Sequence, residues 1–382
     1  MVTTNRSMVA LSGALVVMGC GGTGGGKDAG AGLGSSTPPG QGSETDGNDA
    51  GQASAGQGPT GASGSSGGSG ASSSLDGGGS TGSSPGSAST GSAVGADGGA
   101  GSASSAVPSC ASLPAVTDYS AVGPFADAKM FTSVGPNNDY TLFRPDTSLG
   151  QNGFKHPIVA WGNGISTTPD MYQKTLPLIA SHGFVIIACN DTQAEEPCLS
   201  AGLDWLVAQN TASGPMQGKL DTSREAAVGY SWGGGAAVDT SVRPNIKATV
   251  SLHGMPPRQS GTWSNIHAPL LLFTSTGDNF VTASGYVTPN YMSSTVQTFY
   301  ATLDDSTAGH LYVVDQGASI CIGSLLGSQF GNCGNDTVEH APTIAWLRLW
   351  LCDDTNAKQF FYGDSCTLCQ SPWENPQRKN WQ

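Results

Sequence analysis

The sequence predicts an α/β fold in which a mostly parallel central sheet is flanked by helices. Two observations support this prediction. Short, unbroken apolar runs recur after residue 155, as expected for strands that are covered on both faces. These runs alternate with loops and with longer segments of helical spacing, and such alternation is typical of a parallel sheet.

The first apolar run is 158–161, and a loop over 162–168 follows it. A helix is predicted over 169–182, with Gly183 at the position after its end, where glycine adopts a left-handed conformation without strain. Buried strands are predicted at 184–188, 226–230, 246–252 and 269–274, with a further helix over 198–209. Another strand should begin at residue 298.

Composition divides the chain into a part that folds and a part that does not. Residues 20–107 are rich in Gly, Ser and Ala and contain few large apolar side chains. Burial cannot offset the entropy of ordering such a segment, so a disordered linker is predicted, with a reach of roughly 50 Å. Residues 108–382 are long enough for one catalytic domain with a single core.

The N-terminal residues resemble a targeting signal. Arg6 precedes an apolar run over 8–18, which ends in Gly19-Cys20. The run is too short to span a bilayer of roughly 30 Å. We expect residues 1–19 to be a lipoprotein signal peptide and Cys20 to be lipidated, which would anchor the chain at a bacterial outer membrane or cell surface. Ordinary secretion with an incidental cysteine is the alternative.

The charge balance argues against nucleic-acid partners. The chain carries a net charge of −13, and the part after residue 107 holds 22 acidic and 13 basic side chains. Such a surface repels phosphate backbones, and the sequence contains no basic cluster. We therefore expect no nucleic-acid partner.

Eight cysteines remain in the folded domain when Cys20 is set aside: Cys110, Cys189, Cys198, Cys321, Cys333, Cys352, Cys366 and Cys369. An even number in an exported protein favours up to four disulfides. Local pairs such as Cys189 with Cys198 and Cys321 with Cys333 are candidates, although the spacing does not determine the connectivity. Cys366 and Cys369 have the spacing of a zinc or redox motif, but they lack a second ligand pair, and a structural disulfide is the better interpretation.

A candidate nucleophile follows the predicted strand at 226–230. The motif Gly229-Tyr-Ser231-Trp-Gly233 lies between this strand and a run of small residues that can open a helix. A serine on a sharp turn from strand to helix projects its hydroxyl clear of the sheet, and the flanking glycines relieve the crowding that the turn creates. The amide of Trp232 should face the oxyanion of a bound acyl group. A plain tight turn is the alternative.

A serine nucleophile needs a base, and the base needs an acid to orient it. Asp278 ends the predicted strand at 269–274 in a Gly-Asp pair, and His310 ends the loop after the next strand in a Gly-His pair. The chain order Ser231, Asp278, His310 is the order that α/β-hydrolases use. We predict that these residues form a catalytic triad.

Other residues compete for these roles. His253 also follows a predicted strand, and we interpret it as a substrate-binding residue that lines the pocket. Asp304 and Asp305 are too close in sequence to His310 to reach it easily from another strand. The remaining histidines have less specific patterns: His182 and His340 suggest surface or packing roles, and His156 and His267 suggest turns.

The second oxyanion donor should come from the loop after the strand at 158–161. Gly162-Asn-Gly-Ile165 allows the backbone to turn its amides inward. Ile165 is the predicted donor, with Ser166 as the next choice. Ile165 and Trp232 are also predicted to contact the substrate.

Several motifs together resemble the bacterial cutinases and polyester hydrolases, near the chlorophyllase and dienelactone hydrolase branches of the α/β-hydrolases. The resemblance extends over 124–361 and includes Gly162-Asn-Gly, the serine motif, Gly277-Asp278, Gly309-His310 and the segment from Trp346-Leu-Arg-Leu-Trp-Leu-Cys to Gln359-Phe-Phe. It implies an α/β-hydrolase fold with an open, lidless cleft that cleaves carboxylic esters. Trp232 and His253 depart from the usual pattern, in which a methionine follows the nucleophile and an active-site tryptophan follows the next strand.

The sequence thus predicts an extracellular serine ester hydrolase that acts through an acyl-enzyme on polymeric or lipidic esters. No metal or organic cofactor is implied, and a monomer is expected. A non-catalytic binding module on a hydrolase scaffold and a peptidase of the same fold are the alternatives.

Overall fold

The computed structural model describes residues 113–315, 321, 330–331, 333–334 and 338–381. The predicted signal peptide, Cys20, the linker over 20–107 and Cys110 all lie outside the described residues. Within the described part, no helix combines the length and the apolar character that a membrane crossing requires.

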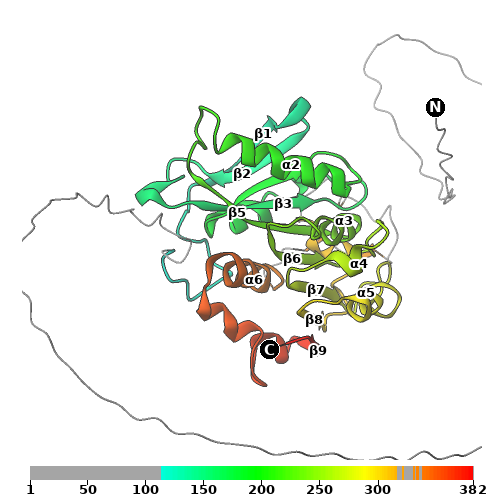
Figure 1. Cartoon of the computed structure of the whole chain (residues 1–382). Helices are drawn as coiled ribbons and strands as arrows, with labels where there is room; N and C mark the ends of the chain where they lie inside the picture. The colour runs from blue at the N-terminus through cyan, green and yellow to red at the C-terminus, as the bar shows by residue number, and fades with distance from the viewer. Residues whose placement is uncertain (1–112, 316–320, 322–329, 332, 335–337, 382) are drawn as a thin grey trace, which may run out of the picture. The chain divides into compact units, whose positions relative to one another are not determined.

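The centre of the domain is a mixed sheet with the strand order β1-β2-β4-β3-β5-β6-β7-β8-β9 (Figure 1). The strands are β1 (Ala128–Val134), β2 (Tyr140–Pro145), β3 (His156–Gly162), β4 (Val185–Cys189), β5 (Leu220–Tyr230), β6 (Ile246–Leu252), β7 (Leu270–Ser275), β8 (Thr298–Leu303) and β9 (Trp373–Lys379). The strands from β3 to β8 pair in parallel, whereas β1, β2 and β9 pair antiparallel at the two edges. The predicted mostly parallel sheet is confirmed.

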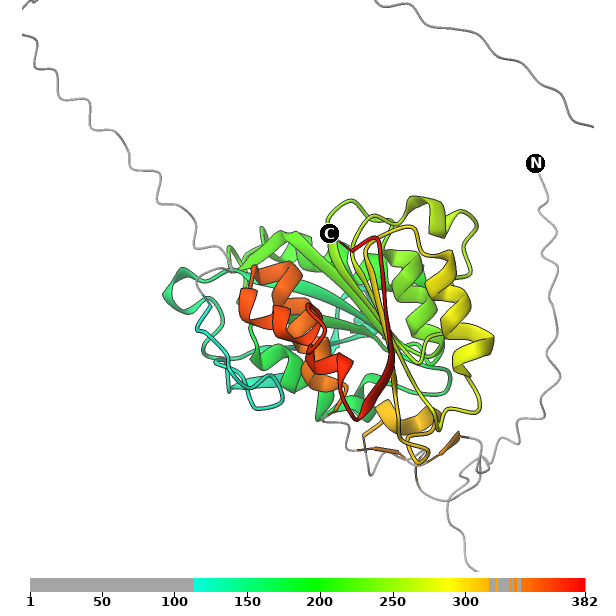
Figure 2. The ribbon, with the colours of Figure 1, turned by 90° about the horizontal axis from the view of Figure 1, so that it is seen from below.

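The α-helices are α1 (Thr175–Ser181), α2 (Glu196–Gln209), α3 (Trp232–Thr240), α4 (Thr262–Asn265), α5 (Thr288–Ser293) and α6 (His340–Cys352). Short 3-10 and π turns are η2 (Pro136–Asn138), η3 (Gln151–Gly153), η4 (Pro169–Tyr172), η5 (Ala283–Val287), η6 (His310–Val313), η10 (Thr355–Phe360) and η11 (Thr367–Cys369). One buried cluster joins the sheet to α1 and α6, and two others join it to α2, α3 and α5. The sheet is therefore covered on both faces, with α6 (orange) and α5 (yellow) on opposite sides of it in Figure 2.

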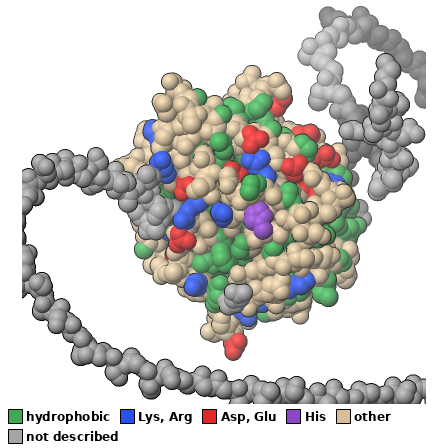
Figure 3. All heavy atoms as spheres, viewed as in Figure 1, with side chains coloured by type: hydrophobic (Ala, Val, Ile, Leu, Met, Phe, Trp, Pro, Cys, Tyr) green, Lys and Arg blue, Asp and Glu red, His purple; other side chains and the backbone are tan. Residues whose placement is uncertain are grey.

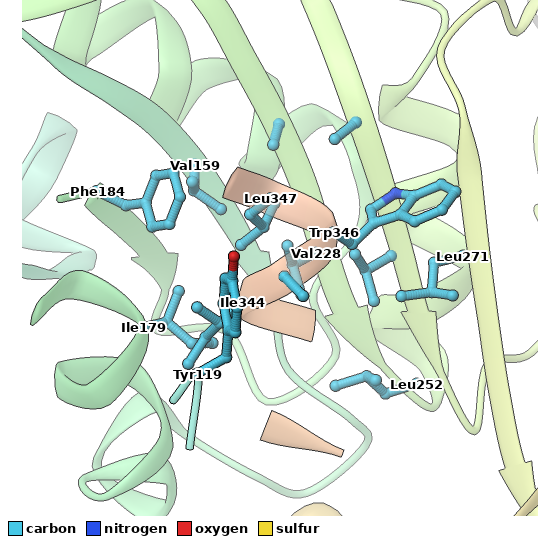
Figure 4. Packing of buried hydrophobic residues seen from close by; sticks show 14 of the residues in the cluster. Tyr119, Val159, Ile179, Phe184, Val228, Leu252, Leu271, Ile344, Trp346 and Leu347 are labelled. Atoms are coloured by element: carbon cyan, nitrogen blue, oxygen red, sulfur yellow. The ribbon is translucent and has the colours of Figure 1, made fainter. Parts of the chain in front are cut away.

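The larger core lies between the sheet and α6. Ile344 and Leu347 of α6 are fully buried against strand residues such as Val159, Val228 and Leu271 (Figure 4). Because burial of one such side chain contributes about 1.5–3 kcal/mol, this apolar stripe fixes α6 on the sheet. The position of α6 matters for the site, since its two ends lie beside different buried polar groups.

Most predicted elements are present, with small shifts at their ends. The predicted helix over 169–182 is divided into η4 and α1, and Gly183 follows with the expected positive φ of 104°. The sequence analysis did not predict β1, β2 or β9. These strands extend the sheet by antiparallel pairing. Polar residues interrupt the apolar ones in β1 and β2, and β9 is mostly polar, so none shows the unbroken apolar run that predicted the parallel strands.

Three complete disulfides join described residues: Cys189–Cys198, Cys321–Cys333 and Cys366–Cys369. The first two are the local pairs considered from spacing, and the third matches the structural interpretation of the Cys-x-x-Cys motif. Cys352 is also disulfide-bonded.

Acidic and basic side chains are interspersed on the face of the molecule in Figure 3, and no broad basic patch is visible on that face.

Candidate active site

Ser231 lies at the junction of β5 and α3. It is the N-cap of α3 and has φ 55° and ψ −117°, a conformation that a side chain other than glycine rarely adopts. The strained turn is fixed by its surroundings, because the Ser231 amide donates to the Leu252 carbonyl at 3.0 Å and the Ser231 carbonyl accepts from the Met255 amide at 2.9 Å. The hydroxyl is thereby raised at the carboxyl edge of the sheet.

Glycines allow the backbones around this turn to approach closely. A Cβ atom on Gly229 would lie 2.1 Å from the Gly233 carbonyl oxygen, and one on Gly233 would lie 2.1 Å from that of Gly162. A Cβ on Gly164 would lie 3.2 Å from the Ser231 Cβ. These contacts exclude larger residues and place the loop after β3 directly against the serine.

The structure brings Ser231, His310 and Asp278 together in a hydrogen-bonded chain. His310 Nε2 lies 2.8 Å from Ser231 Oγ, and His310 Nδ1 lies 2.8 Å from Asp278 Oδ2. Asp278 Oδ1 accepts from the amides of Phe280 and Val281 at 3.0 and 2.8 Å. Each member comes from the end of a different parallel strand or from the loop that follows it, as the sequence predicted.

The protonation states suit a base and the acid that orients it. Burial lowers the pKa of His310, and this effect exceeds the opposing attraction of Asp278. The pKa of Asp278 is lowered although burial opposes this, because His253 and His310 donate hydrogen bonds to its carboxylate. At neutral pH, His310 is therefore a neutral base and Asp278 is an anion.

His253 is not where the sequence analysis placed it. The prediction that it lines the substrate pocket is wrong, because its side chain is fully buried. Its Nδ1 lies 2.8 Å from Asp278 Oδ2, and its Nε2 lies 3.0 Å from Glu339 Oε1. His253 thus lies behind the triad and has no surface to offer a substrate.

Glu339 is the residue of this network that the sequence analysis missed. It immediately precedes α6 and is buried. Its only signal in the sequence is an acidic residue before an apolar helix, which ordinarily indicates a helix terminus.

The structure confirms packing roles for His182 and His340 and contradicts the turn predicted at His156. His182 and His340 are buried, and their Nε2 atoms contact the Ala121 carbonyl and the Thr175 hydroxyl at 2.9 and 2.8 Å. The turn expected at His156 is wrong, because this residue is the first of β3 and is fully buried.

The candidate oxyanion loop follows β3. The Ser166 amide donates to the Thr192 carbonyl at 2.7 Å, so this alternative donor is already engaged within the protein. Ile165 precedes it and Gly164 lies against Ser231, which leaves Ile165 as the better candidate from this loop. Trp232 is the first residue of α3, where backbone amides have no partner within the helix.

Exposed apolar side chains lie on the loops that carry Asp278 and follow β3. Ile165 is 45 % exposed and Phe280 is 38 % exposed. The Phe280 ring centroid lies 5.0 Å from that of His310. Trp232 is half-buried, and the Arg258 guanidinium lies 4.1 Å from its ring centroid. Phe280 was not predicted, although its place two residues after Asp278 could have indicated it.

Among the described residues, one group offers ligand types for a metal ion: His253, Asp278 and His310, whose candidate ligand atoms lie within 4.8 Å of one another. The same atoms form the hydrogen bonds described above, and His310 Nε2 points to a serine hydroxyl. The arrangement therefore suits proton transfer to and from Ser231.

A parallel sheet with Ser231 on a strained turn between strand and helix, and with the acid and the histidine on later loops, defines the α/β-hydrolase fold. Within this class, the chain belongs to the PET hydrolase-like family, whose model matches residues 107–377. The resemblance noted from the sequence is thus confirmed.

The chain is similar to several curated cutinases. It is 30 % identical to "Cutinase est1" of Thermobifida alba over 201 residues, which cover 51 % of this chain and 58 % of that protein. It is 29 % identical to "Cutinase cut1" of Thermobifida fusca over 203 residues, which cover 51 % of this chain and 54 % of the relative. It is 26 % identical to "Bis(hydroxyethyl) terephthalate hydrolase" of Streptomyces coelicolor over 231 residues, which cover 58 % and 64 %. The matches span a little over half the length of these relatives.

Proposed function

We propose that the protein is an extracellular serine carboxylic-ester hydrolase. The observation that carries the proposal is the chain from Ser231 Oγ through His310 to Asp278, with both contacts at 2.8 Å, on a strained turn between strand and helix. Membership in the PET hydrolase-like family and similarity to cutinases support the same reaction.

In the proposed mechanism, Ser231 Oγ attacks the ester carbonyl while His310 Nε2 accepts its proton. Asp278 holds His310 with Nε2 unprotonated and stabilises the imidazolium that forms. His310 then gives the proton to the departing alcohol, which leaves an acyl group on Ser231. Water, deprotonated by His310, attacks the acyl-enzyme in the same way and releases the acid.

The backbone amides of Trp232 and Ile165 are the proposed oxyanion donors. The position of Trp232 at the start of α3 and the contact of Gly164 with Ser231 support this assignment. Each such donor contributes about 2.7–4 kcal/mol to stabilisation of the transition state.

Ile165, Phe280 and the edge of Trp232 are the proposed substrate contacts. The exposed Ile165 and Phe280 side chains favour apolar acyl or aryl groups. Polymeric or lipidic esters, which present such groups at an open surface, are the proposed substrates. The names of the relatives, which include cutinases and a bis(hydroxyethyl) terephthalate hydrolase, support this class.

The proposed location rests on residues 1–20 alone. The apolar run before Gly19-Cys20 supports export and lipidation at Cys20, with the linker as a tether to a bacterial outer membrane or cell surface. A monomeric enzyme without a cofactor is proposed. Metabolic labelling with a tritiated fatty acid tests the anchor: label should enter the wild type and be absent from Cys20→Ser, and equal labelling of both would exclude Cys20 as the site.

The test of the activity is hydrolysis of p-nitrophenyl butyrate and longer p-nitrophenyl esters by the full chain and by Ser231→Ala. The wild type should release p-nitrophenol, and the variant should lose at least about 10⁴-fold in kcat. A folded wild type that cleaves no ester would favour the binding module. Faster cleavage of peptide anilides than of esters would favour a peptidase.

A further inference from the structure

The buried His253 has an environment that a packing residue does not need. Its two ring nitrogens lie 2.8 Å from Asp278 Oδ2 and 3.0 Å from Glu339 Oε1. All three side chains are almost completely removed from solvent. One histidine therefore lies between two carboxyl groups, and one of these groups also orients His310.

The contacts limit the protonation states that this ring can adopt between two carboxylates. A neutral imidazole has one N–H group, so one of its nitrogens would face a carboxylate oxygen as an acceptor. Only the imidazolium donates to both carboxylates at once. Burial opposes the charge, but the charge of Glu339 and the hydrogen bonds to Asp278 and Glu339 exceed this cost and raise the pKa of His253 to about 10.

We propose that Glu339 holds His253 as an imidazolium and that His253 is a positioning residue, which fixes the carboxylate of Asp278 towards His310 and keeps His310 in its neutral, basic form. This inference rests on the proposed function, because it assigns a role within the same triad. It adds His253 and Glu339 to the residues that support catalysis, although neither side chain contacts the substrate.

The positioning follows from the hydrogen bonds of Asp278. Its Oδ2 accepts from both His253 and His310, while its Oδ1 is held by the Phe280 and Val281 amides. The carboxylate therefore has no freedom to rotate away from His310. Such support reduces the reorganisation that the triad would otherwise undergo when His310 accepts the serine proton.

The electrostatic effect has a definite sign. The ring centroids of His253 and His310 lie 6.2 Å apart, and the positive charge on His253 disfavours a second positive charge on His310. His310 must be neutral to act as a base, so the charge on His253 extends activity to lower pH.

The other titratable groups around the ring are Asp278 after β7, Glu339 before α6, His310 in η6 and Tyr230 at the end of β5. The Tyr230 hydroxyl donates a hydrogen bond to the His310 carbonyl at 2.6 Å, and burial raises the pKa of Tyr230 well above the usual value. Tyr230 is therefore uncharged across the working range of pH, and the balance depends on the two acids and the two histidines.

The first experiment is the pH dependence of kcat/KM for p-nitrophenyl butyrate in the full chain, with the wild type, His253→Asn and Glu339→Gln compared. In both variants the acidic limb of the profile should move to higher pH by about one unit, because His310 loses a positive neighbour. In Glu339→Gln the amide can donate to Nε2 of a neutral His253, so the geometry is preserved while the charge on the ring is removed.

The matched control is His156→Asn. His156 is also fully buried, and its two ring nitrogens contact the Gly150 amide and the Gly183 carbonyl at 3.0 and 2.9 Å, far from any member of the triad. A merely structural role of His253 would lower stability in both histidine variants and leave both acidic limbs unchanged. The proposal requires a shift in His253→Asn and none in His156→Asn.

A second measurement tests the proposal even if His253→Asn fails to fold. Nitrogen-15 NMR of the histidine rings in Ser231→Ala should show both nitrogens of His253 protonated at pH 7, and one unprotonated when Glu339→Gln is added. A neutral ring in the first protein, or an unmoved acidic limb in an active Glu339→Gln, would overturn the inference while the esterase assignment stands. An inactive wild type would instead remove the esterase assignment, and the NMR result would still report the charge of His253.

Discussion

The two ends of α6 lie beside buried charged groups of different character. At its start, Glu339 contacts His253, which leads through Asp278 and His310 to the exposed edge at Ser231. In its last turn, the Arg348 Nε atom donates to Asp354 Oδ2 at 2.7 Å. One helix thus lies between a cluster of two histidines and two acids and a cluster built around an arginine.

The cluster in the last turn is a structural one. Arg348 is buried, and its other nitrogens donate to the carbonyls of His182 and Pro114 at 3.4 and 3.1 Å. Tyr119 donates to the same oxygen of Asp354 at 2.9 Å. The contacts join segments far apart in the sequence, so this cluster stabilises the fold without offering a reactive group.

The comparison shows that buried charged groups can either adjust the pKa values of reactive residues or hold the fold together. At the start of α6, burial shifts the pKa of His310 down and the two acids shift that of His253 up, so two histidines on one carboxylate hold different charges. In the last turn, each of the three side-chain nitrogens of Arg348 donates a hydrogen bond to a fixed oxygen. Shifted pKa values in a cleft indicate function, whereas a closed ion pair is usually structural.

The largest expected effect is a loss of activity when the cluster at the start of α6 is changed. His310→Gln should lower kcat for p-nitrophenyl butyrate by about 10⁵-fold, because the serine loses its base. Its melting temperature should stay close to that of the wild type, since one neutral side chain at the edge of the network is replaced. Residual activity within tenfold of the wild type would show that His310 is not the base.

The next largest effect is a loss of stability when the cluster in the last turn of α6 is changed. Arg348→Met should lower the free energy of unfolding by about 3–5 kcal/mol, because Asp354 is left without its cation, while kcat of the folded protein is unchanged. Urea unfolding and steady-state kinetics measure the two quantities. Arg224→Met is the matched control: Arg224 pairs with Asp353, whose side chain is 62 % exposed, and its loss should cost about 1 kcal/mol or less. Equal losses in both variants would contradict the distinction.

His253, near the start of α6, and His182, beside its last turn, should make the free energy of unfolding depend on pH with opposite signs. The pKa of His253 is raised to about 10, so its contribution is present below its unfolded pKa of about 6.5 and is lost as pH rises towards 10. Burial lowers the pKa of His182 to about 4, so the protein loses stability as pH falls from about 6.5 towards 4. Each of these histidines should contribute a slope of about 1.4 kcal/mol per pH unit between its folded and unfolded pKa values.

Urea unfolding between pH 4.5 and 9.5 measures these slopes. His253→Asn should remove the alkaline loss alone, and His182→Asn should remove part of the acidic loss alone. A wild-type stability that stays constant between pH 7 and 9.5 would show that His253 is neutral in the folded protein.

The smallest expected effect is that of Tyr119→Phe. The change removes one hydrogen bond to Asp354 and should cost about 1–2 kcal/mol, because the acceptor is charged. Thermal unfolding and ester hydrolysis should show lower stability with unchanged kcat. A fall in kcat without a change in stability would connect the last turn of α6 to the reaction and remove the distinction drawn here.

Much of the site was predictable because its members carry local signals. Ser231 lies in a glycine-flanked motif after a strand, and Asp278 and His310 end Gly-Asp and Gly-His pairs after later strands. In a parallel sheet, the carboxyl ends of the strands share one edge, so these signals were enough to bring the residues together. The antiparallel strands β1, β2 and β9 were not predictable in this way, since polar residues interrupt the apolar residues in each of them.

The sequence by itself determined the α/β class, the parallel strands and the candidate triad, because each depends on periodicity or on a short local motif, whereas the cysteine pairs were only candidates until the structure joined them. Only the tertiary structure decided the environment of His253. Its pattern, a histidine after a buried strand, is compatible with a pocket or with the interior. The choice depends on Glu339, which is 86 residues away in sequence and reaches the ring only because α6 packs across the sheet.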